Sequence, residues 1–242
     1  MKFKAMSYNN NSMNYDAFLY AILAGLIPAF IWLTFWLHED IEHPEPRWLI
    51  AGAFLAGALS VIVAIFAEKY ISDAVANETG RYTLWAAVEE IIKFGTVGMV
   101  ALRTRWNDEP IDAMIYAITV ALGFSAIENT LFVLSPLSNG EITQSIVTGS
   151  MRFVGATLVH IVSSATVGFA LGLAFYRGRI FKIVSGTLGL ITAIALHAGF
   201  NLSIISSSPS DTLKSFLWIW IAVVILMILF EEVKAVRPKL IV

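Results

Sequence analysis

Long apolar runs alternate with short polar stretches along the whole chain. A helix needs about 20 residues to cross the hydrocarbon core of a bilayer, and seven runs come close to or exceed this length: 17–37, 48–67, 82–102, 113–134, 153–176, 183–205 and 213–232. Charged, proline-containing or serine-rich segments separate them, without a linker or an internal repeat. The pattern predicts an all-α polytopic membrane protein, a bundle of about seven transmembrane helices. We expect one domain over residues 1–242, with a polar N-terminal tail at 1–14.

Composition supports this interpretation and excludes several classes of function. The chain is 57% hydrophobic and only 14% charged, whereas an ordinary soluble domain is about one quarter charged. Its net charge of −2 gives no support for a nucleic-acid partner. It contains no cysteine, which excludes disulfides, thiolate metal ligands and a cysteine nucleophile. The expected surroundings are therefore the lipid bilayer of the cell membrane.

The loops differ in their basic residues, and this difference predicts the orientation. One set of alternate loops carries nine lysines and arginines, and the other carries five. The richer set contains Arg47, Arg103, Arg105, Arg177, Arg179, Lys182, Lys234, Arg237 and Lys239. With seven helices, the N-terminus would lie outside and the C-terminus in the cytoplasm.

Three ionisable residues interrupt the apolar run at 82–102: Glu89, Glu90 and Lys93. A charged group at the centre of a bilayer costs roughly 2.5–3.5 kcal/mol on insertion scales. Such groups persist where they face a protected interior and are paired or functional. Glu89 and Lys93 are four residues apart, the spacing and order of a favourable ion pair on one helix face.

Polar residues on four predicted helices fall at a similar depth. Early in 82–102 lie the two glutamates, late in 113–134 lie Glu128 and Asn129, near the middle of 153–176 lies His160, and late in 183–205 lie His197 and Asn201. Because consecutive helices run in opposite directions, these positions share one layer, which the orientation places in the outer half of the membrane. Carboxylate and histidine together are typical of acid–base chemistry or of a metal site.

Structural roles compete with functional ones for each residue taken alone. A Glu–Lys pair, a single histidine such as His160, or the amides of Asn129 and Asn201 can simply join helices through hydrogen bonds. The combination of acids and histidines in one layer favours function.

Four motifs then resemble those of the PrsW family of intramembrane proteases. They are EExxK at Glu89–Lys93, the segment DAMIYAITVALGFSAIEN at Asp112–Asn129, Arg152 followed by His160, and HxxxN at His197–Asn201. They occur in the family's order and cover about half of the chain. The family is similar to the CAAX-processing and bacteriocin-processing proteases.

The resemblance implies roles for these residues. Glu89 would be the general base on water, with Glu90 orienting it or binding the substrate backbone, and His197 and Asn201 would stabilise the oxyanion. The chain departs from the wider group where Phe124-xxx-Glu128 replaces FxxxH, so the water-activating role of that histidine passes to His160 or Glu128. Supporting positions would be Lys93, Phe124, Glu128, Asn129 and Arg152.

The implied function is glutamate-dependent intramembrane endopeptidase activity, with the catalytic helices at about 82–205. The implied substrate is a single-pass membrane protein, of the anti-sigma-factor type, cut by regulated proteolysis near the extracytoplasmic face. This chemistry needs no cofactor.

Other functions remain open at this point. A zinc protease would use Glu90, Glu128, His160 and His197, although the chain has no HExxH motif. Intramembrane acids and histidines also occur in proton-coupled transporters, and a non-enzymatic scaffold is a further alternative.

Overall fold

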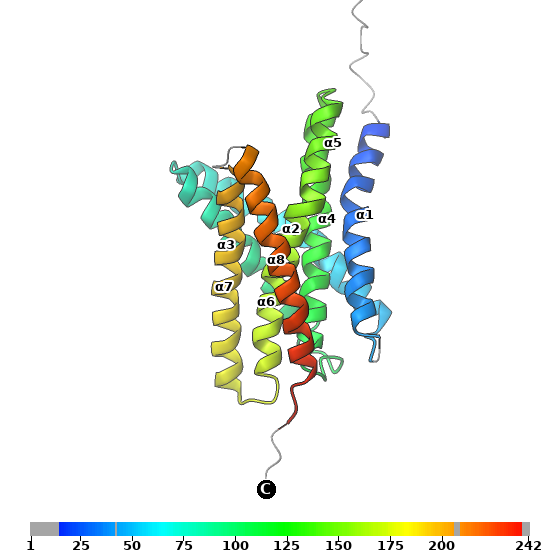
Figure 1. Cartoon of the computed structure of the whole chain (residues 1–242), viewed down its shortest axis with the longest axis vertical. Coiled ribbons are helices and arrows are strands. Elements are labelled where there is room, and N and C mark those ends of the chain that lie inside the picture. Colours follow the sequence, from blue (N-terminus) through cyan, green and yellow to red (C-terminus); the bar gives the residue numbers. More distant parts are fainter. Residues whose placement is uncertain (1–14, 42, 206–208, 239–242) are drawn as a thin grey trace, which may run out of the picture.

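A computed structural model describes residues 15–41, 43–205 and 209–238, and these are arranged as a bundle of helices (Figure 1). In chain order the helices are α1 (Tyr15–Glu39), α2 (Arg47–Ala74), α3 (Glu78–Val100), α4 (Asp112–Ser138), α5 (Ile142–Met151), the π-helical turn η1 (Arg152–Ala156), α6 (Thr157–Leu173), α7 (Arg179–Ile205) and α8 (Pro209–Lys234). The predicted all-α membrane bundle is confirmed. The expected polar tail at 1–14 lies outside the described residues.

Six helical segments of the described chain are long and apolar enough to cross a membrane: α1, α2, α4, the continuous α5–η1–α6 segment, α7 and the Leu213–Lys234 part of α8. The seventh expected helix is present as α3. Its charged residues (Glu78, Arg81, Glu89, Glu90 and Lys93) keep it out of this group. Asn77 caps its start, because the Asn77 side chain accepts a hydrogen bond from the Gly80 amide.

Helix α4 forms the centre of the bundle. Every residue from Asp112 to Ala126 is buried, and α1, α2 and α6 pack around this helix. Two glycines allow α2 to cross it closely. A Cβ atom at Gly57 would lie 2.1 Å from the Val120 carbonyl oxygen, and one at Gly123 would lie 2.0 Å from that of Phe54. The α2–α4 crossing is therefore a direct contact between the two backbones.

Two helices extend beyond the apolar runs that predicted them. Helix α2 continues to Ala74, past the expected end at residue 67, and the helical segment ending in α6 begins at Ile142 rather than at 153. Hydropathy marks where lipid contact ends, whereas backbone hydrogen bonding continues through polar residues. In Figure 1, α5 accordingly extends α6 along the upper part of α4.

The loop after α1 contains a buried acid outside the spans. Asp40 is 6% exposed, and its Oδ2 atom has no hydrogen-bond partner among the described residues. Burial, reinforced by the nearby charge of Asp112, raises the pKa of Asp40 to about 7.

Candidate active site

The predicted polar layer is assembled by four helices. Glu89 and Glu90 come from α3, Glu128 from α4, His160 from α6 and His197 from α7. Glu89, Glu90, His160 and His197 are almost completely buried. The two histidine rings contact each other edge to face, with centroids 4.9 Å apart. Residues distant in sequence thus form one compact cluster.

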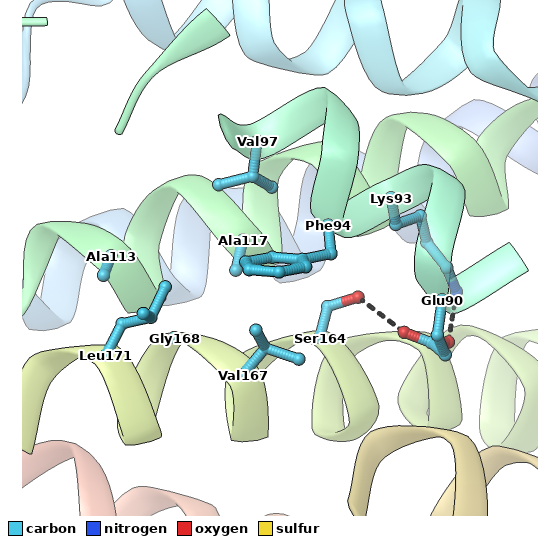
Figure 2. Close-up of a pocket in the computed structure, with 10 residues that line it drawn as sticks. All are labelled: Glu90, Lys93, Phe94, Val97, Ala113, Ala117, Ser164, Val167, Gly168 and Leu171. Atoms are coloured by element: carbon cyan, nitrogen blue, oxygen red, sulfur yellow. Dashed lines mark hydrogen bonds and ion pairs between the residues drawn. The ribbon is translucent and has the colours of Figure 1, made fainter. Parts of the chain in front are cut away.

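Glu90 is an acceptor with three donors around it. Its Oε1 atom accepts hydrogen bonds from Lys93 Nζ at 2.5 Å and from His197 Nδ1 at 2.7 Å, and its Oε2 atom accepts one from Ser164 Oγ at 3.3 Å. Figure 2 shows Glu90 and Lys93 on α3, with the carboxylate directed towards Ser164 of α6. Glu90 therefore joins α3, α6 and α7 and fixes the ring of His197.

The two histidines have a defined tautomer because each contacts a carboxylate, which can only accept. His160 Nε2 donates to Glu128 Oε2 at 2.8 Å, so its Nδ1 atom carries the lone pair, and this atom accepts from Lys93 Nζ at 2.9 Å. His197 donates through Nδ1 to Glu90, so its lone pair lies on Nε2. These proton positions are inferred from the partners. Both lone pairs lie on the side of Glu89.

Glu89 completes a set of three acceptors. Its Oε2 atom lies 3.8 Å from His197 Nε2 and 3.9 Å from His160 Nδ1, and it has no hydrogen-bond partner among the described residues. Lys93 Nζ, the partner expected from sequence, is 3.9 Å from Glu89 and lies much closer to Glu90. Lone pairs that face one another repel unless a cation or a proton donor lies between them, and Lys93 Nζ, 2.9 Å from His160 Nδ1, supplies such a donor to one of the three.

This donor set fits a divalent metal ion. One ligand atom each from Glu89, His160 and His197 lie within 4.8 Å of one another, and a glutamate with two histidines is a known catalytic zinc set. Metal-binding histidines usually donate their other ring nitrogen to a carboxylate, as His160 does to Glu128 and His197 does to Glu90. These three ligands differ from the four that the sequence predicts for a zinc protease, which are Glu90, Glu128, His160 and His197. Glu89 faces the lone pairs, while Glu90 and Glu128 contact the opposite sides of the two rings.

Arg152 supports Glu128 from the π-helical turn. It donates to Glu128 Oε2 at 2.6 Å and to Asn129 Oδ1 at 2.5 Å. Asn129 in turn donates to Thr157 Oγ1 at 2.9 Å. In a regular α-helix, Arg152 and His160 would point about 80° apart. The π turn closes with a bond from the Thr157 amide to the Arg152 carbonyl, and its extra residue reduces this angle to about 20°. Both side chains therefore reach the same oxygen of Glu128.

A cavity of about 520 Å³ opens beside the cluster. Its walls come from α2, α3, α4, the α5–η1–α6 segment, α7 and α8, and they are mostly apolar. Asn201 lines it, one helical turn beyond His197. Phe124 also lines it, and this ring packs against His160 and lies 4.9 Å from Lys93 Nζ. The buried polar cluster therefore borders an open cavity.

The structure adds two polar residues that the sequence did not single out. Ser164, on α6, binds Glu90. Glu68, on α2, lines the cavity next to Glu89. Glu68 falls one residue beyond the apolar run 48–67, where the sequence predicts a loop. The sequence does contain a signal for this position, because the 3.6-residue periodicity of a helix face continues through Val61, Ala64 and Glu68.

Comparison with known proteins identifies the family of this chain. The model of the PrsW family intramembrane metalloproteases matches residues 45–230. Protease PrsW of Oceanobacillus iheyensis is 29% identical over 183 residues, covering 74% of this chain and 80% of the relative. Protease PrsW of Geobacillus kaustophilus is 30% identical over 156 residues, covering 63% and 66% respectively, and that of Bacillus subtilis is 21% identical over 187 residues. No solved structure matches the chain. With four ordered motifs meeting in one buried cluster, and with the family match over most of its length, the chain belongs to the PrsW family of intramembrane proteases.

Proposed function

We propose that this chain is a metal-dependent intramembrane endopeptidase. The observation that carries the proposal is the convergence of Glu89 Oε2, His160 Nδ1 and His197 Nε2, three buried lone-pair atoms that face one another. Glu89 Oε2 has no hydrogen-bond partner among the described residues. Glu89, His160 and His197 would hold the metal ion. A divalent ion there would polarise the scissile carbonyl and make water more acidic.

The remaining residues of the cluster prepare the site. Glu90 and Glu128 hold the rings of His197 and His160 with their lone pairs turned inwards. Lys93 compensates the charge of Glu90 at 2.5 Å. The amide of Asn201, which lies in the cavity wall, would donate a hydrogen bond to the oxyanion. Donors of this kind contribute about 2.7–4 kcal/mol to catalysis in other hydrolases.

We propose a membrane-anchored protein as the substrate, in particular a single-pass protein of the anti-sigma-factor type cut near the extracytoplasmic face. The cavity lies among membrane spans and has mostly apolar walls, so it suits a peptide segment delivered from the bilayer. The excess of basic residues in alternate loops favours an active site in the outer half of the membrane.

A second candidate mechanism uses no metal. Lys93 Nζ lies 2.9 Å from His160 Nδ1 and already gives that lone pair a donor. In this mechanism Glu89 is the general base on water. Glu90 is already held by its donors and would orient Glu89 only through the shared α3 backbone.

The test has two stages. First, the N-termini of membrane proteins are compared between cells that express the wild type and cells that express Glu89→Gln at the same level. Glu78→Gln is the matched control, an exposed acid on the same helix. New termini are expected with the wild type and with Glu78→Gln only. Identical termini in all three strains would contradict protease activity and favour a transporter or a scaffold.

In the second stage, the purified wild-type protein cuts the substrate so identified, before and after exhaustive chelation. Loss of cleavage, with recovery on adding Zn²⁺ or another divalent ion, is the expected result. Cleavage that survives chelation in metal-free protein would exclude the metal-dependent mechanism and establish the glutamate-only one.

A further inference from the structure

Glu68 lines the wall of the cavity that Glu89, His160 and His197 also line. On α2 the residues Val61, Ala64, Ile65 and Glu68 form one face, and all four line the cavity. The backbone of Glu68 is tied to α3, because the indole N–H of Trp85 donates to the Glu68 carbonyl at 3.1 Å. Glu68 is half-buried, so it is partly accessible from the open space of the cavity.

Its partners set Glu68 apart from the other acids. Glu128 is bound by Arg152 and His160, and Glu90 is bound by Lys93, His197 and Ser164. Glu68 forms no ion pair with a described residue, and it lines the same cavity as Glu89, His160 and His197.

A general base must lie next to the reacting centre and keep an oxygen available for the water proton. If Glu89 is a metal ligand, another group must act as this base.

We propose that Glu68 is the proton-transfer residue of the site, an inference that rests on the proposed function. Its carboxylate takes a proton from the attacking water as the water oxygen bonds to the scissile carbonyl carbon. The tetrahedral intermediate keeps the second water proton. When the C–N bond breaks, Glu68 returns its proton to the leaving nitrogen. The products are a carboxylic acid and an amine, and Glu68 is again a carboxylate.

The test compares Glu68→Gln and Glu68→Asp with the wild type, using the substrate identified by its new N-terminus. Asp73→Asn is the control, since Asp73 is an exposed acid on the same helix outside the cavity. Glu68→Gln should lower kcat by about 10²–10⁴-fold, the usual contribution of general acid–base catalysis. KM should stay close to the wild-type value. Glu68→Asp should recover at least part of the lost kcat, because it keeps a carboxylate.

Two further measurements do not depend on turnover. Zn²⁺ bound per protein chain, determined by elemental analysis after equilibration and washing, should be the same in Glu68→Gln and the wild type. Uncut substrate should co-purify with Glu68→Gln, because binding persists while cleavage stops. Thermal unfolding of both variants is measured in parallel, and Glu68→Asp serves as the folded comparison should Glu68→Gln unfold.

The outcomes separate this inference from the proposed function. Wild-type protein that cuts its substrate without metal, or cuts nothing, contradicts the proposed function. Metal-dependent wild-type cleavage with an unchanged kcat in Glu68→Gln overturns only the role of Glu68. Loss of bound Zn²⁺ in Glu68→Gln also overturns it, since Glu68 would then act on the metal site and not on the proton.

Discussion

The close crossing of α2 and α4 predicts that Gly57→Ala destabilises the protein and weakens catalysis. The added Cβ atom would lie 2.1 Å from the Val120 carbonyl oxygen, with the Val120 C and Cα atoms at 2.9 and 3.0 Å. These are backbone atoms, so no side chain can rotate away. Real Cβ contacts are essentially never below 3.0 Å, so α2 must move away from α4 by about 0.9 Å.

Gly52→Ala is a matched control on the same helix, because no atom beyond the adjoining backbone of its own helix lies within 4 Å of its added Cβ. Both substitutions gain up to about 1 kcal/mol from helix propensity, so the difference between them isolates the clash. Overpacking of this kind costs about 1–3 kcal/mol. For a chain of this size that corresponds to a Tm about 2–12 °C lower for Gly57→Ala than for Gly52→Ala, measured by thermal unfolding in one detergent.

The displacement should also reach the cavity. Glu68 lies eleven residues beyond Gly57, which on an α-helix places it about 20° from the same face. A shift of roughly 1 Å at a catalytic group can cost about 100-fold in rate, so kcat of Gly57→Ala should fall well below that of Gly52→Ala. Equal Tm values for the two variants would refute the argument from the backbone contact.

Three more substitutions test other contacts. Glu128→Gln removes the carboxylate that orients His160 and should weaken metal affinity by about 10–100-fold; an unchanged affinity in a Zn²⁺ titration would argue against a metal ligand there. Arg152→Gln leaves the largely buried Glu128 without its cation and should lower the free energy of unfolding, measured with denaturant, by about 3–5 kcal/mol. A decrease below about 1 kcal/mol would show that water compensates the charge of Glu128. The pKa of Asp40 is raised from 3.8 to about 7, so the folded state holds a proton that the unfolded chain has released. Its stabilising contribution is full below pH of about 4 and is lost as the pH rises to about 7. Asp40→Asn should abolish this decline, and an unaltered pH dependence of Tm would contradict the assignment.

The sequence predicts the cluster because it contains both the depth of each polar residue in the membrane and the direction of each helix. Glu89 early in one apolar run and His197 late in another must lie on the same side of the membrane, and the structure places them 3.8 Å apart. Which acid faces the histidines was not predictable. Glu89 and Glu90 are neighbours with the same composition around them, and only the rotation of α3 against α6 and α7 turns Glu90 towards Ser164 and His197 Nδ1 and Glu89 towards the lone pairs.

The π-helical turn and the role of α2 escaped prediction for different reasons. A π turn needs one extra residue within a helix whose apolar pattern is otherwise unbroken, and the segment RFVGA at Arg152–Ala156 contains no proline to mark it. Glu68 was not predicted, because an acid at the end of an apolar run is typical of the start of a loop. In both cases tertiary contacts decide the local geometry, and they involve residues far away in the chain.

The enclosure of α4 has a consequence for how the protein is made. The chain is synthesised from the N-terminus, so α1 and α2 are available when α4 enters the membrane, but α6 follows only after the α5–η1 segment. Until then the face of α4 that will pack against α6 has no protein partner. Insertion intermediates that stop after α4 therefore expose a surface built for protein contact. We expect cellular quality control to recognise truncated or stalled chains at this helix.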